Sequence, residues 1–461
     1  MHLLWQIGRR VILAGLVGTA LCLTCLVPLL AVLAAEARPN LVLLLADDLG
    51  YGDLGCYGCP DIRTPHLDRL ARQGVRLTQF YANGPECTPT RAALLSGRYP
   101  QRSGGLECAI GLGNVGRYDD AIRLAMQREL GLPVAHSVLA RGLKAAGYQT
   151  AIVGKWHLGY EPQFAPRRHG FDRFFGPLGG AVDYFFHCEP GGQPMLYENE
   201  QPVKRDGYLT DLIADEACRF VRQARQPFFL YVPLTAPHSP YQGPRDRPDA
   251  PVTLEASNRG SRATYVAMVE RLDEAIGRML ATLEETGAAS STLVLFASDN
   301  GGTTYSRNAP FSGQKGSTYE GGIRVPCLLR WPGELPAGTV SEEIGITMDL
   351  TASLLAAAGA TPPDGIKLDG IDLIGALQRG ETLPARTLYW RQRRGDRTWR
   401  GVRDGPWKLV SRADGSQRRD QLFNLASDPA EQHDLAAEQP QTLHRLLTLL
   451  ARWEEEVRPA R

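Results

Sequence analysis

The chain has 461 residues, of which 43% are hydrophobic and 22% are charged. This composition is typical of a globular protein with an ample core, and the length favours one large domain with a smaller one. The formal net charge of +1 argues against nucleic acid as a partner. Only six of the 51 basic residues are lysines, so the positions of individual lysines are more informative than usual.

Residues 1–37 have the pattern of a targeting segment. Arg9 and Arg10 precede an apolar run over 11–35, and small residues follow this run before Arg38. A basic flank, an apolar middle and a small-residue exit are typical of a secretory signal peptide. We therefore expect export, to the periplasm or the medium. Because the run is longer than usual for a signal peptide, the alternative is an uncleaved membrane anchor.

The first element after this segment is a continuous apolar run over 40–46, which leads directly into Asp47 and Asp48. Such a run predicts a buried parallel strand with both carboxylates at its C-terminal tip. A short helix over 65–74 and a strand over 75–80 are expected next.

The stretch 84–98, Gly-Pro-Glu-Cys-Thr-Pro-Thr-Arg-Ala-Ala-Leu-Leu-Ser-Gly-Arg, predicts a reactive group at a helix start. Thr88 can cap the helix and Pro89 suits its first position. We expect the helix dipole to lower the pKa of the Cys87 thiol and to favour an anionic ligand beside it. Arg91, one turn further on, would face the same spot. The alternative is a buried structural cysteine.

Residues 103–131 show no clear period and are expected to form a variable loop. An amphipathic helix over 134–146 and a buried strand over 148–153 should follow. The strand leads into Lys155 and His157, which an extended segment would point to the same side.

The pattern of a strand with a polar tip then repeats. Its elements are a strand over 227–232 leading to His238, a long amphipathic helix over 263–286, and a strand over 292–297 leading to Asp299 and Asn300. This alternation predicts an α/β fold with a large doubly wound, mostly parallel sheet flanked by helices. Ligands of such sheets bind at the carboxyl ends of the strands, so the polar tips should converge there.

The C-terminal part changes character. Its short alternating segments lie at 387–390, 398–403, 407–411 and 421–424, and an amphipathic segment covers 441–457. They predict a smaller antiparallel sheet with a helix packed on it. We expect a catalytic α/β domain over 38–382 and an α+β subdomain over 383–461. The charged run over 391–397 is expected to be a solvated loop.

Asp47, Asp48, Asp299 and Asn300 offer only oxygen ligands. Such a set suits a hard divalent cation, and a cage made entirely by protein favours Ca²⁺ over Mg²⁺. The alternative for adjacent acids after a strand is an exposed loop. The paired strand ends favour the metal site.

Seven cysteines follow the targeting segment, and they allow several disulfide pairings between which the sequence does not choose. Cys56 and Cys59 lack the second pair that a zinc site would need. We expect a local disulfide or free thiols there.

Several motifs along the chain belong together. They are Cys-Thr-Pro-Thr-Arg at 87–91, Leu-Leu-Ser-Gly-Arg at 94–98, Gly-Lys-Trp-His-Leu-Gly at 154–159, Ala-Pro-His-Ser-Pro around His238, and Phe-Ser-Gly-Gln-Lys-Gly-Ser around Lys315. This set resembles the arylsulfatase A-like sulfatases of the alkaline phosphatase superfamily. The resemblance spans about residues 40–437 and departs from the usual signature at Thr90, where Ser or Ala is common.

The resemblance implies that a formylglycine-generating enzyme oxidises Cys87 to Cα-formylglycine. It implies a Ca²⁺ site formed by Asp47, Asp48, residue 87, Asp299 and Asn300. In the implied mechanism a hydroxyl of hydrated formylglycine attacks sulfur, with Asp299 as its base.

The resemblance also assigns roles to the remaining site residues. These roles are charge neutralisation by Lys155 and Lys315, protonation of the leaving alcohol by His238, proton removal by His157, and orientation by Arg91. Asp183 and His187 fall where family members often contact substrate. The rim of the site is expected from 103–131, 183–207 and the C-terminal sheet.

The function expected from the sequence is therefore that of an exported sulfatase acting on a sulfated glycan or small molecule, with an aryl sulfate as the other substrate class. One alternative is a phosphonate or phosphate ester hydrolase of the same superfamily. The other is an unmodified, non-catalytic binding homologue, which a lost ligand or an unmodified Cys87 would favour.

Overall fold

The computed structural model describes residues 38–111 and 118–459, so the predicted targeting segment lies outside the described residues. In these two ranges no helix is both long and apolar enough to cross a membrane. The described residues from Pro39 to Pro459 belong to one compact unit.

In the described residues, ten strands form the main sheet, in the order β10-β2-β9-β8-β1-β7-β3-β4-β5-β6. They are β1 (Asn40–Ala46), β2 (Val75–Tyr81), β3 (Gln149–Val153), β4 (Arg173–Pro177), β5 (Leu196–Glu198), β6 (Gln201–Pro202), β7 (Phe228–Pro233), β8 (Thr292–Ser298), β9 (Cys327–Arg330) and β10 (Thr339–Ile346). Only β9 and β5 are antiparallel to both described neighbours. The prediction of a large, mostly parallel sheet is confirmed.

The side chains of β1 alternate between two hydrophobic cores, one on each face of the sheet. Leu41, Leu43 and Leu45 belong to one core, and Val42 and Leu44 belong to the other. Burial on both faces explains why this strand is a continuous apolar run rather than an alternating one.

Helices cover both faces, as a doubly wound sheet requires. Side chains of α3 (Cys87–Ser96), α4 (Asp119–Met126), α5 (Leu139–Ala145), α9 (Thr347–Ala357) and α10 (Leu373–Arg379) enter the first core. Side chains of α2 (Pro65–Arg72), α6 (Leu209–Gln223) and α7 (Arg262–Glu285) enter the second.

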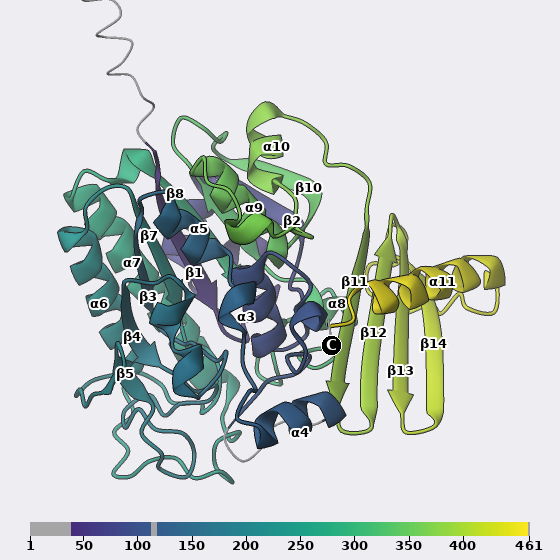
Figure 1. Cartoon of the computed structure of the whole chain (residues 1–461), viewed down its shortest axis with the longest axis horizontal. Helices are drawn as coiled ribbons and strands as arrows, with labels where there is room; N and C mark the ends of the chain where they lie inside the picture. The colour runs from purple at the N-terminus through teal and green to yellow at the C-terminus, as the bar shows by residue number, and fades with distance from the viewer. Residues whose placement is uncertain (1–37, 112–117, 460–461) are drawn as a thin grey trace, which may run out of the picture. The chain divides into compact units, whose positions relative to one another are not determined.

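A separate antiparallel sheet of four described strands forms the C-terminal part, as predicted (Figure 1). Its elements are β11 (Thr387–Arg394), β12 (Arg397–Asp404), β13 (Trp407–Asp414), β14 (Gln417–Asn424) and the helix α11 (Pro440–Glu456). A shared core joins this sheet to the main body, where the Trp390 indole donates to the Ala82 carbonyl at 2.7 Å. The expected domain boundary between residues 382 and 383 stays a prediction.

The charged run over 391–397 is not a solvated loop, contrary to the prediction. Its first residues complete β11, and only the hairpin turn to β12 is irregular. Arg391 Nε donates to the buried carboxylate of Glu107 at 2.7 Å, and Arg393 Nη2 donates to the same carboxylate at 2.8 Å. A buried acid from a distant segment therefore neutralises charges that looked solvent-facing in the sequence.

Two further local predictions were wrong. The segment 103–131 contains the helix α4, whose short pattern was too weak to read, although its residues 112–117 lie outside the described ranges. The helix expected over 134–146 begins only at Leu139, after a single 3₁₀ turn.

Candidate active site

Four adjacent strands of the main sheet, β8, β1, β7 and β3, carry the polar tips that the sequence predicted. β8 leads into Asp299 and Asn300, β1 into Asp47 and Asp48, β7 toward His238, and β3 toward Lys155 and His157. Because these strands are parallel neighbours, their carboxyl ends lie at one edge of the sheet, where α/β proteins bind ligands.

The helix α3 brings Cys87 to this edge as its first residue. Glu86 is the N-cap, and it makes no capping hydrogen bond through its side chain, so the predicted cap at Thr88 was wrong. The Thr88 hydroxyl instead donates to the His157 carbonyl at 3.1 Å and accepts from the Ile110 amide at 3.2 Å. Thr88 thereby fixes the loops on either side of the reactive residue.

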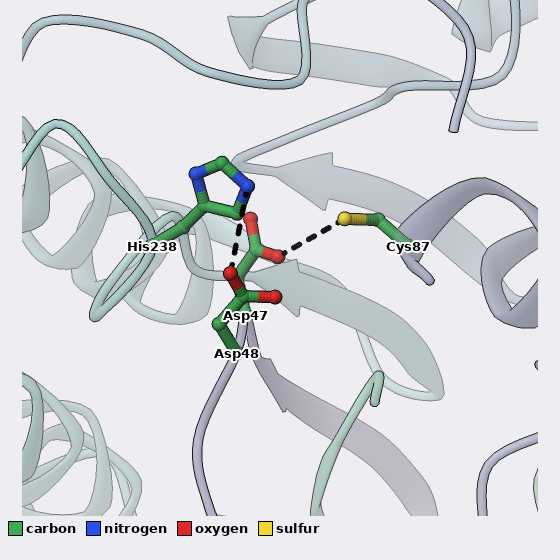
Figure 2. Close-up of side chains that lie close together, drawn as sticks. All are labelled: Asp47, Asp48, Cys87 and His238. Carbon is green, nitrogen blue, oxygen red and sulfur yellow. Dashed lines mark hydrogen bonds and ion pairs between the residues drawn. The ribbon is translucent and has the colours of Figure 1, made fainter. Parts of the chain in front are cut away.

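Cys87 is 1% exposed, and its thiol lies between the carboxylate of Asp47 and the ammonium of Lys315. It donates to Oδ1 of Asp47 at 3.4 Å (Figure 2). Lys315 Nζ donates to the thiol at 3.6 Å. Burial, followed by the charge of Asp47, raises the pKa of the thiol to about 12. The expected lowering by the helix dipole was therefore wrong, because burial costs the thiolate more than the helix start supplies.

The carboxylate of Asp47 is buried among positively charged side chains. Its Oδ2 accepts from Lys155 Nζ at 2.5 Å, and Arg91 Nη2 lies 3.7 Å away. Burial alone would raise the pKa of Asp47, but the charges of Lys155, His238, Arg91 and Lys315 outweigh burial and hold it well below its ordinary value. Asp47 is thus held as a carboxylate.

Arg91 connects the helix α3 to the end of β8 through hydrogen bonds. Its Nε and Nη2 donate to Oδ2 of Asp299 at 3.0 and 2.7 Å, and its Nη1 donates to the Lys155 carbonyl at 3.2 Å. Burial and the nearby charge of Asp47 raise the pKa of Asp299. Two carboxylates therefore lie close enough to repel each other, with Arg91 between them.

The carboxylate of Asp48 contacts three other side chains of the site. It accepts from Asn300 Nδ2 at 2.7 Å and from Lys315 Nζ at 2.8 Å. His238 Nε2 lies 3.6 Å from the same carboxylate, and Figure 2 shows this contact beside that of Asp47 with Cys87.

Donor atoms suitable for a metal lie together here. The ligand atoms of Asp47, Asp48, Cys87 and His238 are all within 4.8 Å of one another. The Asn300 Oδ1 is buried and accepts no hydrogen bond from any described residue, which leaves an oxygen free to face a cation. Oxygen-rich, anionic surroundings fit a hard divalent cation. The cluster differs from the predicted ligand set by including His238, while Asp299 is engaged with Arg91.

His157 does not continue an extended segment, because its φ is 58°, so the argument that it shares a side with Lys155 fails. Its Nε2 lies 2.5 Å from the Ile110 carbonyl and therefore donates, while its buried Nδ1 has no partner among the described residues. Burial and the charge of Lys155 hold the pKa of His157 well below its ordinary value.

A cavity of about 750 Å³ opens over these groups, and its lining includes Asp48, Cys87, His157, His238 and Lys315. Its rim draws on all three expected segments. It includes Ile110, Glu189 and Arg394, with further rim residues Tyr160, Tyr241, Asn258, Thr303 and Tyr305 from loops that the sequence did not indicate. These residues are scattered in sequence and belong to no motif, so the sequence held no signal for them.

Asp183 and His187 are not among the described residues that line this cavity. The Asp183 carboxylate accepts four hydrogen bonds, from the amides of Phe185, Phe186 and Val252 and from the side chain of Gln242. His187 Nε2 lies 3.1 Å from the Gly207 carbonyl. The structure therefore gives both residues protein partners and does not bring them to the other predicted site residues.

All seven cysteines of the described ranges are free thiols, including Cys56 and Cys59.

The comparison with protein families decides the classification. Residues 39–360 match the model described as Sulfatase, and residues 314–455 match the model described as N-sulphoglucosamine sulphohydrolase, C-terminal. The chain belongs to the sulfatase family. It is accordingly a sulfuric ester hydrolase, as the sequence motifs predicted.

Known relatives support this classification over nearly the whole chain. The sulfatase is 35% identical to the Homo sapiens N-acetylgalactosamine-6-sulfatase, with 92% of this chain and 87% of that protein covered. The crystal structure of Ps i-CgsB in complex with k-i-k-neocarrahexaose has a TM-score of 0.78 and 31% identity, covering 92% of this chain and 94% of that one. The phosphonate monoester hydrolase of Agrobacterium radiobacter, with a TM-score of 0.62 and 20% identity over 91% of this chain and 95% of that one, shares the fold alone.

Proposed function

We propose that this sulfatase is exported and hydrolyses a carbohydrate sulfate. It would use a formylglycine made from Cys87 and a Ca²⁺ ion bound by Asp47, Asp48, Asp299 and Asn300. The observation that carries the proposal is the position of the Cys87 sulfur. It lies in the cavity, 3.4 Å from Asp47 and 3.6 Å from Lys315, so it is flanked by a candidate metal ligand and by a cation that can bind sulfate.

Hydrated formylglycine at position 87 would supply a hydroxyl nucleophile, and Ca²⁺ would lower the pKa of that hydroxyl and attract the sulfate oxygens. Asp47, Asp48, Asn300 and Asp299 are the residues proposed to hold the ion. Their oxygen donors favour Ca²⁺ over Mg²⁺, which usually keeps several waters instead of a complete protein cage.

The basic residues of this chain act on the substrate charge. Lys315 lines the cavity and Lys155 lies behind Asp47, so both neutralise negative charge that grows on the sulfate oxygens. Arg91, bound to Asp299 and close to Asp47, keeps the two carboxylates in fixed orientations.

The two histidines of the cavity are suited to proton transfer. His238 hydrogen-bonds through Nδ1 to the Ser239 carbonyl at 2.6 Å, which leaves Nε2 facing Asp48 and the cavity. We assign to it the protonation of the departing sugar hydroxyl. His157, whose Nδ1 has no described partner, is assigned the removal of a proton from residue 87 as sulfate leaves.

A carbohydrate substrate is supported by the names of relatives, among them an N-acetylgalactosamine-6-sulfatase and a structure that holds a carrahexaose. Export is supported by the pattern of residues 1–37. Maturation would need a formylglycine-generating enzyme as a transient partner. The phosphonate hydrolase alternative has only a shared fold in its favour, and the non-catalytic alternative is opposed by the complete set of predicted ligands.

The test is sulfate release from a panel of sulfated monosaccharides and oligosaccharides, using protein produced together with a formylglycine-generating enzyme. The panel should include 4-nitrophenyl sulfate and a phenyl phosphonate ester. We expect turnover of at least one sugar sulfate, and none by the Cys87→Ala variant. Hydrolysis of the phosphonate ester at a higher kcat/KM than any sulfate would contradict the proposal.

A further inference from the structure

One wall of the cavity carries a carboxylate that the proposed chemistry does not use. Glu189 lines the cavity together with Cys87 and His157. In the described part of the chain no Lys, Arg or His forms an ion pair with it; the Tyr160 hydroxyl donates to its Oε1 at 2.9 Å, and the backbone of Gly180 also hydrogen-bonds to its carboxylate. An acid without a paired cation is unexpected in a cavity that must attract sulfate.

The backbone fixes Glu189 in a tight turn. Its amide donates to the Gln193 carbonyl at 2.9 Å, and the Gly192 amide donates to the Glu189 carbonyl at 2.9 Å. An antiparallel bridge between Cys188 and Pro194 closes the turn. The carboxylate is therefore presented from a hydrogen-bonded turn, which favours a fixed position for a residue that orients a ligand.

Two glycines allow the carboxylate to approach the centre. A Cβ atom on Gly179 would lie 2.3 Å from Oε1 of Glu189, and a Cβ atom on Gly180 would lie 2.4 Å from Nε2 of His157. Any side chain at these positions would displace Glu189 or His157. The glycine pair thus leaves room for both side chains, and Glu189 and His157 line the same cavity.

The charge of Glu189 indicates what it binds. A carboxylate repels the sulfate group. Burial is the largest influence on the Glu189 carboxyl, and it raises the pKa of this group. Such a group is retained at a substrate site when it accepts hydrogen bonds from a neutral part of the ligand. The donors that a sulfated sugar offers beside its sulfate are ring hydroxyls and the N–H of an amino or acetamido group.

The aromatic part of the rim suits the same ligand. Tyr241 and Tyr305 line the cavity, with ring centroids 4.9 Å apart and ring planes at 90°. The two rings present an edge and a face, so they offer apolar surface for the C–H groups of a pyranose.

We propose that Glu189 is a specificity-determining residue, which accepts a hydrogen bond from a hydroxyl or N–H of the sugar ring that carries the sulfate. The inference rests on the proposed sugar sulfatase activity and deepens it. Aryl sulfates offer no such donor, so Glu189 selects sugar sulfates over them. Sites built to bind a substrate O–H or N–H discriminate strongly against analogues that lack it.

The test compares Glu189→Ala and Glu189→Gln on two substrates, the best sugar sulfate of the panel and 4-nitrophenyl sulfate. We expect Glu189→Ala to lower kcat/KM for the sugar sulfate by about 100-fold or more, and to leave the rate on 4-nitrophenyl sulfate within about threefold. Glu189→Gln, which keeps an acceptor oxygen, should lose less. The control Glu255→Gln removes the same charge from an exposed residue that is not in the cavity lining, and should change neither rate.

Equal losses on both substrates would overturn the inference, because Glu189 would then support the chemistry or the fold. The absence of any loss would overturn it as well.

Calorimetric binding to the Cys87→Ala protein separates this inference from the proposed function, since binding needs no turnover. Glu189→Ala in that background should weaken the sugar sulfate at least tenfold and leave inorganic sulfate unchanged. If binding behaves so while the mature enzyme releases no sulfate, only the proposed function fails; if no sugar sulfate binds, the inference fails.

Discussion

The ammonium of Lys155 lies 2.5 Å from the carboxylate of Asp47, and both side chains are fully buried. The two residues follow different strands, β3 and β1, which are separated by β7 in the sheet. This ion pair therefore fixes the ends of separate strands and brings a cation behind the candidate metal ligand.

Replacing Lys155 should damage both the fold and the reaction. Lys155→Ala removes the nearest cation from the buried Asp47 and leaves Arg91, 3.7 Å away, as its closest ion-pair partner among the described residues; losing one partner of a buried pair costs about 3–5 kcal/mol. Urea unfolding should show a loss near the lower end of this range, and sulfate release should fall about 100-fold or more. Lys144→Ala, which removes an exposed partner of Asp172, should cost at most about 1 kcal/mol. Equal losses for the two variants would contradict the account.

Metal removal should lower thermal stability. Asp47, Asp48 and Asp299 crowd together in the metal-free protein, so a bound cation relieves their repulsion. Saturation at about 100 times the Kd should stabilise the folded protein by about 2.7 kcal/mol. Thermal melts in Ca²⁺, Mg²⁺ and chelator should give the highest Tm in Ca²⁺.

The variant Asn300→Ala serves as the matched test of that site. It removes the buried oxygen that has no described hydrogen-bond partner, so the rise in Tm with Ca²⁺ should require more ion than in wild type. Identical melts of wild type with Ca²⁺ and with chelator would exclude a calcium site at this cluster.

The hairpin β11–β12 should matter for activity although it is far from Cys87 in sequence. Arg394 lines the cavity and forms a 2.5 Å ion pair with Glu86, whose other oxygen accepts from the Ala109 amide at 2.6 Å. Arg394→Ala frees the residue that immediately precedes Cys87, so we expect kcat/KM to fall about tenfold, equivalent to about 1.4 kcal/mol.

The matched control for Arg394 is Arg397→Ala. Arg397 lies in the same hairpin but forms an exposed pair with Asp414, so activity should stay within about twofold. A comparable loss from both variants would show that the hairpin acts only through folding.

Asp273 should give stability a measurable pH dependence. This residue of α7 accepts the amides of His66 and Leu67, and burial raises its pKa to about 6. A raised pKa stabilises the fold fully below about pH 3.9, and this contribution disappears as the pH rises through about 6. Between about pH 4 and about pH 7, wild type should therefore lose up to about 3 kcal/mol relative to Asp273→Asn. Parallel unfolding curves for the two proteins across this range would contradict the assignment.

The sequence predicted the main sheet and the meeting of the polar tips because both follow from local pattern. A strand such as β1 is apolar along its whole length, and the polar residues follow immediately where it ends. Parallel order then brings Asp47, Lys155 and Asp299 to one edge without further information. The catalytic and metal-binding roles of these residues stay predictions.

Features that depend on contacts between distant segments could not be predicted. The pairing of Arg391 with Glu107 and the approach of Arg394 to Glu86 appear only when the C-terminal sheet packs on the main body. The high pKa of Cys87 has the same origin, because the helix start was visible in the sequence but the burial of the thiol was not.

The most direct test of the central claim is the mass of the tryptic peptide 77–91, which carries Cys87, from protein produced with a formylglycine-generating enzyme. We expect a peptide lighter than the cysteine form by the difference between a CH₂SH and a CHO group, in protein that also releases sulfate. An intact thiol in every molecule, while the same modifying enzyme converts a control sulfatase, would contradict this expectation. The chain would then be a sulfatase fold without its nucleophile.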